Sequence, residues 1–234
     1  MNVKKKVFVL SLVFGMFCLF TSGALAIDVL YAPLEGFPDL VNARTNVYVY
    51  DGVSLQLLAC QVQNGLVPVW GKVGKALSFN GKRYITVPDS DWLDLGKDDF
   101  AITFWMKTKS TKDYNSIIDK RKGHYAPGYH VTLYNGRPLL CLCESPGGQN
   151  RWTNYVADTT VNDGKGHYVA FYVERNNPSG GKIYVDGQCV KTFNPTGRNG
   201  SLNNDQDLLI GRHCVWKDKH FEGILDELWI FRGK

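Results

Sequence analysis

The sequence predicts an all-β fold, an antiparallel sandwich of two sheets of the jelly-roll type. Two observations support this prediction. Short segments of alternating side-chain pattern recur along the chain, and Gly, Pro, Asn and Asp residues separate them. No segment with a helical period is longer than two turns. Closely spaced strands that are joined by turn residues are typical of sandwiches and jelly rolls.

The clearest pattern lies in residues 163–190. Residues 167–175 alternate between two largely apolar faces, which predicts a strand in the middle of a sheet. The chain then continues as a turn at 176–181, a strand at 182–185, a turn at Asp186-Gly187 and a strand at 188–191. We therefore expect a meander of three antiparallel strands.

The first 26 residues have the pattern of an export signal. Lys4-Lys5-Lys6 precedes an apolar run from Val7 to Phe20, and Ala24-Leu25-Ala26 has the small-x-small form of a cleavage site. Because the apolar run is short and ends at this pattern, it favours a cleaved signal over a membrane span. We expect a secreted or otherwise extracytoplasmic domain of residues 27–234, with no membrane span in the mature chain.

The charge of the mature chain excludes one class of partner. Three of the 27 Lys and Arg residues lie in the predicted signal, so 24 remain against 22 acidic residues, a net charge of +2. No cluster of Lys and Arg is interleaved with aromatic residues, as it would be in a groove that follows phosphates. We therefore expect no nucleic-acid partner.

The cysteines predict a limited disulfide framework. Without Cys18, an odd number remains: Cys60, Cys141, Cys143, Cys189 and Cys214. At most two disulfides and one free thiol follow. Cys141 and Cys143 share one face of a strand and are poorly placed to pair with each other. A Cys-x-Cys metal site is the alternative, but it lacks a second Cys or His pair at zinc-like spacing.

The remaining strands are predicted at 28–35, 47–50, 54–62, 73–81, 84–88, 99–109, 116–120, 129–134, 139–143, 152–157, 207–211 and 221–231. The Asn80-Gly81 pair predicts a hairpin between 73–81 and 84–88. Segment 99–109 has one strongly apolar face, as a central strand does. Segment 221–231 is apolar on both faces, and we expect it beside the first strand.

Several motifs occur together in this order: Gly74-x-Ala76-Leu77-x-Phe79-x-Gly81, Asp99-Phe100-x-Ile102-x-Phe104-Trp105, Asp163-Gly164-Lys165-x-His167, Tyr184-Val185-Asp186-Gly187 and Phe221-x-Gly223-x-Leu225-Asp226-Glu227. The set resembles the laminin-G-like and concanavalin A-like jelly-roll family from about Val29 to Phe231. The resemblance implies two curved antiparallel sheets. It also implies a concave face that often accepts glycan or peptide, and in some members a calcium ion.

The family includes lectins, hydrolases and adhesion modules, so the fold does not decide the function. Its retaining glucanases carry Glu-x-Asp-x-x-Glu on one strand, which places two carboxylates at the same bond. None of the five glutamates, Glu35, Glu144, Glu174, Glu222 and Glu227, has this spacing. Asp226 and Glu227 are adjacent, and adjacent residues of a strand point to opposite faces. We therefore expect no enzyme.

Sugar recognition needs flat aromatic faces beside planar polar groups. Three stretches provide this mixture: Arg151-Trp152-x-Asn154-Tyr155, His124-Tyr125 with Tyr129-His130 around the Pro127-Gly128 bend, and Arg212-His213-x-x-Trp216. The predicted ligand-binding residues are Arg151, Trp152, Tyr155, Tyr125, Arg212, His213 and Trp216. The alternative is that these aromatics cap sheet edges. For Trp105 and Trp229, which lie in apolar strands, core packing is the simpler interpretation.

Calcium is the cofactor to consider, in a structural role. Relatives that bind it use an early acidic segment and an Asp on the last strand, and the matching positions here are Glu35, Asp39 and Asp226. Asp226 is otherwise an odd member of an apolar strand face. Its alternative role is to accept backbone hydrogen bonds.

Together these features predict an exported, non-catalytic binding module that recognises carbohydrate or another extracellular surface ligand. The alternative is a structural or adhesive scaffold in an extracellular or cell-surface assembly. A glycoside hydrolase is the third and least supported hypothesis, because the sequence provides so few carboxylates.

Overall fold

The structure is a computed structural model, and it describes residues 27–32, 47–50, 57–63 and 65–233. In these ranges the regular elements are strands and three one-turn 3-10 helices, η1 (Asp91–Leu93), η2 (Thr196–Arg198) and η3 (Lys217–Lys219). The predicted signal lies outside them. No helix in the described ranges has the length and apolar character that crossing a membrane requires. The prediction of an all-β fold is confirmed.

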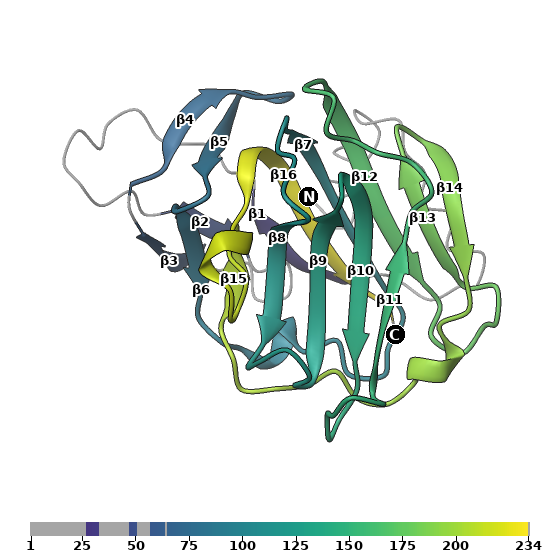
Figure 1. Cartoon of the computed structure of the whole chain (residues 1–234). Coiled ribbons are helices and arrows are strands. Elements are labelled where there is room, and N and C mark those ends of the chain that lie inside the picture. The colour runs from purple at the N-terminus through teal and green to yellow at the C-terminus, as the bar shows by residue number, and fades with distance from the viewer. Residues whose placement is uncertain (1–26, 33–46, 51–56, 64, 234) are drawn as a thin grey trace, which may run out of the picture.

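Two antiparallel sheets form the molecule (Figure 1). Sheet A runs in the order β14 (Gln188–Phe193), β13 (Gly181–Val185), β12 (Gly166–Val173), β7 (Phe100–Lys107) and β16 (Glu222–Arg232). Beyond β16 it continues through β5 (Lys75–Asn80) to β4 (Val67–Trp70), and through β1 (Ile27–Ala32) to β2 (Val47–Tyr50). The predicted meander and the pairing of the last strand with the first are both confirmed.

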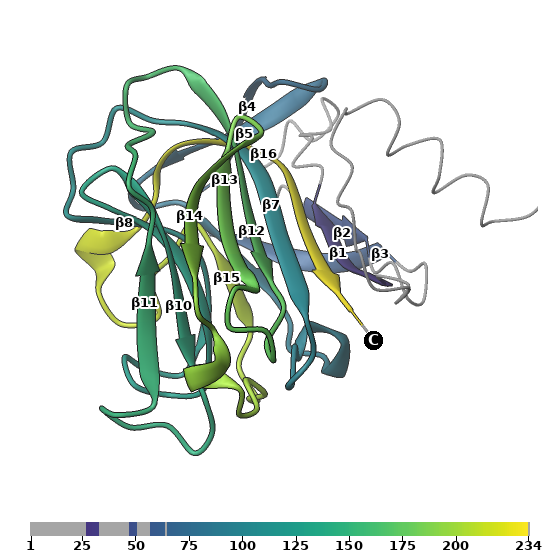
Figure 2. The same cartoon turned by 90° about the vertical axis from the view of Figure 1, so that its right-hand side faces the viewer.

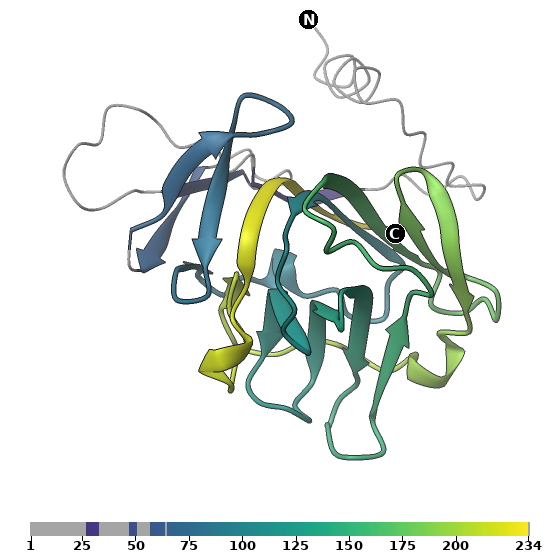
Figure 3. The same cartoon turned by 45° about the horizontal axis from the view of Figure 1, so that its top comes forward.

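Sheet B forms the second layer (Figures 2 and 3). Its order is β11 (Trp152–Val156), β10 (Arg137–Cys143), β9 (Gly128–Tyr134), β8 (Tyr114–Arg121), β15 (Leu208–Ile210), β6 (Tyr84–Val87) and β3 (Leu57–Gln63). Strand β3 links the two sheets because it pairs with β2 in one and with β6 in the other.

The predicted hairpin at Asn80-Gly81 is wrong. Strand β5 pairs with β16 in sheet A, whereas β6 pairs with β15 in sheet B, so the chain crosses between the layers at this turn. The backbone N–H of Gly81 donates to the carbonyl of Phe221 (2.8 Å) rather than closing a two-strand ladder. The crossing lets Phe79 and Ile85 enter the core from opposite layers, and both are almost fully buried.

Strand β16 changes partner in its middle. Its first half pairs with β5 at Glu222–Leu225, and its second half pairs with β1 at Leu228–Arg232. The register with β7 shifts between Asp226 and Trp229, and Glu227 adopts a positive φ of 49° there. This is a β-bulge, which bends and twists the strand. One strand thereby joins two branches of sheet A.

The core lies between the sheets. Phe104 of β7 and Phe171 of β12 meet at 6.5 Å between ring centroids, and Val131 and Leu140 of sheet B belong to the same buried cluster. Trp105 is on the other face of β7, half-buried against Tyr168 (5.2 Å), and Trp229 is also only half-buried. The predicted core packing of these two tryptophans is therefore wrong.

Alternation along the strands of sheet B separates its two faces. In β9, Tyr129, Val131 and Leu133 belong to the core, so His130 and Thr132 lie on the outer face. The same alternation in β8, β10 and β11 gives the outer face most of its polar side chains. Figure 1 looks onto these four strands with sheet A behind them.

Candidate functional site

The outer face of sheet B carries a small cavity of about 70 Å³, which we call the sheet B groove. It is lined by Tyr114, Arg121, His124, His130, Leu139, Cys141, Trp152, Asn154, His213 and Trp216. Strands β8 to β11 supply the floor. The loop 122–127 and the loop 211–220 supply the rim.

Strand register explains why these residues meet. One row across the sheet is Asp119, His130, Cys141 and Asn154, and the next is Arg121, Gly128, Cys143 and Trp152. Gly128 has a positive φ of 135°, and a Cβ there would come within 2.9 Å of the Arg121 Cγ. Glycine at this position leaves room for the Arg121 side chain to lie across the floor.

The floor is an ion pair. Arg121 Nε donates to Asp119 Oδ1 (2.7 Å) and Nη2 to Oδ2 (2.9 Å), and both side chains are almost completely buried. Burial alone would raise the pKa of Asp119, but the charge of Arg121 and its hydrogen bonds hold that pKa well below the ordinary value. The pair therefore stays charged at neutral pH, and its two charges compensate each other.

Asp119 also fixes the rim. Its Oδ2 accepts the backbone N–H of Cys214 (3.0 Å), which ties the loop 211–220 to β8. In that loop, His213 Nδ1 accepts the N–H groups of Val215 (3.0 Å) and Trp216 (3.1 Å). The rings of His213 and Trp216 stack at 4.7 Å. The carboxylate thus sets the position of Trp216 through the loop.

Aromatic rings form the rim. The His124 ring lies 4.8 Å from Trp216 and 5.8 Å from Trp152, and Tyr125 lies 5.8 Å from Trp152. Trp216 remains 38% exposed, which is high for so large an apolar side chain. Exposed aromatic faces above polar floor groups are suited to bind a sugar ring by stacking and hydrogen bonding.

The floor also contains a set of metal-ligand atoms. Atoms of Asp119, His213 and Cys214 lie within 4.8 Å of one another. However, Arg121 already occupies both carboxylate oxygens as a cation, and burial raises the pKa of the Cys214 thiol to about 12. A metal ion at this position would compete with the guanidinium for the same carboxylate oxygens. The Asp119 carboxylate is therefore already committed to a cation, the guanidinium of Arg121.

The cysteines form no disulfide with one another in the described part of the chain, where Cys60, Cys141, Cys143, Cys189 and Cys214 are all thiols. The structure thus does not contain the disulfides expected from the sequence. The Cys143 thiol donates to the carbonyl of Tyr125 (3.2 Å), and Arg121 Nη1 lies 3.8 Å from the Cys141 sulfur. Both thiols help to fix the floor of the groove and its adjoining loop.

The structure brings four of the seven predicted ligand-binding residues together: Trp152, Tyr125, His213 and Trp216 surround the groove. Arg151 lies next to it, half-exposed and paired with Glu144 (3.3 Å).

The other two predicted residues lie elsewhere. Tyr155 points into the core and stacks on Phe193 (4.0 Å), because it is one residue out of phase with Asn154. The Arg212 guanidinium lies over the ring of Tyr84 at 4.6 Å.

Sequence reasoning missed the ion pair of Asp119 and Arg121. A signal was present: in Ser116-Ile117-Ile118-Asp119-Lys120-Arg121, opposite charges two residues apart end an apolar strand. Residues at that spacing share one strand face, so the two side chains could be expected to pair there.

Of the three residues predicted to hold calcium, only Asp226 lies in the described part of the chain. Asp226 is buried, and its Oδ2 accepts the backbone N–H groups of Lys72 (2.7 Å) and Val73 (3.1 Å). Calcium needs six to eight oxygen ligands, whereas this carboxylate oxygen faces N–H donors. Asp226 therefore anchors the 71–73 turn. Glu35 and Asp39 lie outside the described residues, so a site that includes them stays a prediction.

Removal of calcium provides a test. We expect the same melting midpoint with 1 mM calcium and with excess chelator, because the turn amides already bind the Asp226 carboxylate. Differential scanning calorimetry measures this. A midpoint that rises with calcium concentration would contradict the expectation and would place an ion in the fold.

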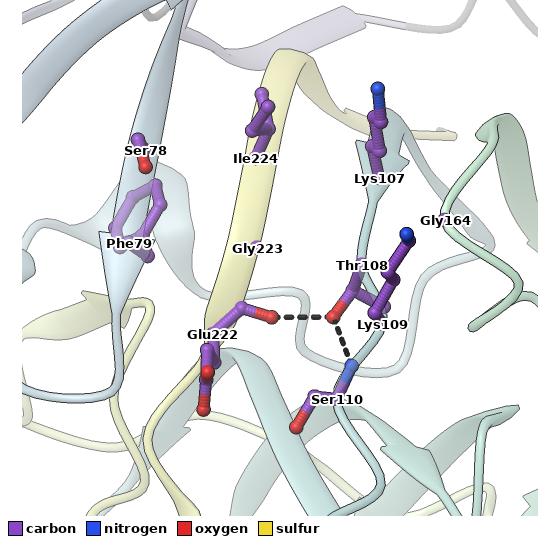
Figure 4. A pocket seen from close by; sticks show the side chains of 10 residues that line it. All are labelled: Ser78, Phe79, Lys107, Thr108, Lys109, Ser110, Gly164, Glu222, Gly223 and Ile224. Atoms are coloured by element: carbon purple, nitrogen blue, oxygen red, sulfur yellow. Dashed lines mark hydrogen bonds between the residues drawn. The ribbon is translucent and has the colours of Figure 1, made fainter.

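A second hollow is larger, about 290 Å³, and lies near the first half of β16 (Figure 4). Thr108 Oγ1 donates to the carbonyl of Glu222 and accepts the N–H of Ser110 there, and Lys107 and Lys109 extend beside it. Its one aromatic lining residue, Phe79, is only 2% exposed. Because it offers no open ring face, we place the ligand site in the smaller sheet B groove.

Comparisons with known proteins agree with this fold. A family model described as the concanavalin A-like lectin/glucanases superfamily matches residues 79–234. No curated protein sequence matches the chain.

Among solved structures, domain 4 of AbnA, a GH43 extracellular arabinanase from Geobacillus stearothermophilus in complex with arabinotriose, is 17% identical, with a TM-score of 0.61. The match covers 89% of this chain and 93% of that domain.

Toxin binding domains are similar as well. The binding domain of Paraclostridial mosquitocidal protein 1 is 14% identical, with a TM-score of 0.65 over 88% of this chain and 48% of that one. The binding domain of botulinum neurotoxin DC in complex with rat synaptotagmin II is 13% identical, with a TM-score of 0.62 over 88% and 48%. The chain thus spans about half the length of these toxin domains. At such identities, the likeness shows the fold alone.

Proposed function

The chain belongs to the concanavalin A-like lectin/glucanase superfamily, and from this premise we propose that it is an exported, non-catalytic module that binds carbohydrate in the sheet B groove. One observation carries the proposal. Trp152 and Trp216 come from distant parts of the chain, yet both rings lie within 6 Å of His124 above one polar floor.

The chemistry of the groove supports a sugar ligand. A pyranose or furanose ring presents C–H groups on its faces and hydroxyl groups on its edge. The indole rings can stack on the former, and the Asn154 amide, with both donors and an acceptor, can bind the latter. The arabinanase domain with bound arabinotriose supports a glycan ligand on this fold, and so does the botulinum neurotoxin DC binding domain in complex with SialylT.

Two observations support a binding role rather than catalysis. Glycoside hydrolysis uses two carboxyl groups that flank one bond. Asp119, the carboxylate of the floor, holds Arg121 with both oxygens, and the described lining residues include no other Asp or Glu. The toxin neighbours are described as binding domains. Export is supported by the pattern of residues 1–26.

The second candidate is adhesion to a protein, in a scaffold of an extracellular or cell-surface assembly. The neurotoxin domain bound to synaptotagmin II favours it, because that complex shows a protein ligand on a related fold. In that case the half-exposed aromatics would pack against a partner protein.

Alanine variants of the two tryptophans test the proposal. We expect Trp152→Ala and Trp216→Ala each to weaken glycan binding by about 10- to 100-fold, since the loss of one stacked ring costs about 1.5–3 kcal/mol. A glycan array followed by isothermal titration calorimetry measures this.

Trp70→Ala is the matched control, because Trp70 is 78% exposed on β4 of sheet A and is not part of the groove. If the folded, unmodified protein binds no glycan on the array, the scaffold hypothesis is favoured.

A further inference from the structure

A series of half-buried side chains continues from the sheet B groove across the outer face of the sheet. On β11, Trp152, Asn154 and Val156 alternate onto this face, and each is half-buried. Arg137 of β10 and Tyr134 of β9 are paired across their strands on the same face and are half-buried as well. Strands β8 to β11 lie side by side (Figure 1), so a ligand can contact side chains from all four.

Strand register places Trp152 and Tyr134 far apart on this face. Trp152 belongs to the row of Gly128, and Tyr134 is six residues further along β9. At about 3.4 Å per residue, the backbones of the two rows are about 20 Å apart. One sugar ring cannot contact both rows, whereas a chain of several sugar residues can.

Tyr114 connects the far row to the groove. It is one of the residues that line the groove, and it is paired with Tyr134 across β8 and β9. The two tyrosine rings lie 5.0 Å apart, and the Arg137 guanidinium lies over the Tyr134 ring at 5.8 Å. Tyr114, Tyr134 and Arg137, which we call the Tyr134 cluster, are therefore continuous with the groove.

The polar groups of the Tyr134 cluster are uncommitted. Among the residues that the structure describes, the Arg137 guanidinium has no ion-pair or hydrogen-bond partner, and neither do the two phenol hydroxyls. The acidic side chains that follow or precede these strands are already paired, Asp113 with Lys219 and Asp158 with Lys191. A guanidinium that lies over an aromatic ring can bind a carboxylate through two of its N–H groups.

Positive charge lies beside the groove and not in its floor. Arg121 is neutralised by Asp119 in the floor. Next to Trp152, however, the carboxylate of Glu144 is shared by two guanidinium groups, those of Arg151 (3.3 Å) and Arg198 (3.6 Å). Together with Arg137 in the far row, this leaves unbalanced cations at both ends of the series of half-buried side chains. Such an arrangement suits a chain with repeated negative charges.

From this arrangement we infer that the ligand is a chain of several sugar residues that carries carboxylates. One sugar ring stacks on Trp152 and Trp216, and the chain follows β11 past Asn154. A uronic acid residue further along the chain binds Arg137 through its carboxylate and rests on Tyr134. The inference rests on the proposed function, and it names the ligand class and a second contact region of the same site.

Calorimetric titration of disaccharides and hexasaccharides tests the inference. The panel consists of linear chains of galacturonic acid and of glucuronic acid, the methyl esters of the same chains, and neutral galactan and xylan chains. We expect an acidic hexasaccharide to bind at least tenfold more tightly than its disaccharide and than its methyl ester, because it alone reaches Arg137 with a charge. A change from about 0.05 M to about 0.5 M NaCl should remove most of its advantage over the ester.

Variants of the Tyr134 cluster test the second contact region directly. Arg137→Gln should weaken binding of the acidic hexasaccharide about tenfold, to the level of the ester, and leave binding of the disaccharide unchanged. Tyr134→Ala should weaken binding of the acidic hexasaccharide and of its ester, again without effect on the disaccharide. Arg83→Gln is the matched control, because Arg83 is also half-buried, has no ion pair in the described part of the chain and does not line the groove.

The unchanged affinity for the disaccharide also shows that each variant is folded. Equal affinity for disaccharide and hexasaccharide, tighter binding of the ester or of a neutral chain, or full binding of the acidic hexasaccharide by Arg137→Gln would overturn the inference. Glycan recognition at Trp152 and Trp216 would stand in each of these cases. Binding to no member of the panel would overturn both.

Discussion

Asp119→Ala is expected to lower the free energy of unfolding by about 3–5 kcal/mol, the usual cost of leaving a buried charge without its partner. Arg121 would keep its charge in a floor from which water is excluded, with only a carbonyl and a sulfur beside it. The backbone N–H of Cys214 would lose its acceptor as well. Urea denaturation, followed by tryptophan fluorescence, measures the change.

Two control variants separate burial from charge. Asp158 pairs with Lys191 at 3.2 Å on the surface, so Asp158→Ala should cost less than about 1 kcal/mol. The double variant Asp119→Leu with Arg121→Met removes both charges and should be more stable than Asp119→Ala alone. If Asp119→Ala costs no more than Asp158→Ala, the ion pair does not support the floor.

Mild acid is expected to destabilise the protein through the buried histidines behind the groove rim. Burial lowers the pKa of His213 and of His220 to about 4, against an ordinary value near 6.5 in the unfolded chain. Between these values the unfolded state binds more protons than the folded state. Stability is therefore complete above pH 6.5 and falls as the pH drops to 4, by about 1–3 kcal/mol for each histidine.

His213→Asn isolates one contribution. The asparagine oxygen can accept the N–H groups of Val215 and Trp216 as Nδ1 does, but it does not titrate in this range. The decrease in the free energy of unfolding between pH 6.5 and 4 should then be smaller by the part that is due to His213. Urea denaturation at both pH values measures this. An unchanged loss would show that His213 does not drive it.

His167 provides a contrast of opposite sign. Burial would lower its pKa, but hydrogen bonds to Asp186 (2.8 Å) and Asp163 (3.0 Å) raise it. His167 therefore contributes to the free energy of unfolding below the pKa that it has in the unfolded chain. This contribution is lost as the pH rises through the pKa that it has in the folded protein. It cannot account for a loss of stability in acid.

Local sequence patterns predicted most of the strands, but they do not specify which strands pair across the fold. The meander of β12 to β14 could be read because tight turns join neighbouring strands, so that sequence order equals spatial order. The crossing between the sheets at Asn80-Gly81 could not be predicted, because an Asn-Gly turn is compatible both with a hairpin and with a connection from one sheet to the other. Strand β4 was missed because it is mostly exposed and shows no buried alternation.

The site was predictable only in part for a related reason. Trp152 and Trp216 stood out as aromatics among polar neighbours, and the fold brings them together. Tyr155 was misplaced because a shift of one residue reverses the face of a strand. The row that joins Asp119 to His130 depends on the register between β8 and β9, which a local pattern does not specify.

The position of β16 has a consequence for synthesis of the protein. Strand β7 can complete its pairing on that side only with residues 222–232, and β1 and β5 depend on the same strand. While these residues are still inside the ribosome, the edges of β7, β1 and β5 that pair with β16 have no neighbouring strand. We expect the domain to complete its folding only after residues 222–232 have left the ribosome, and nascent-chain binding factors matter most before that point.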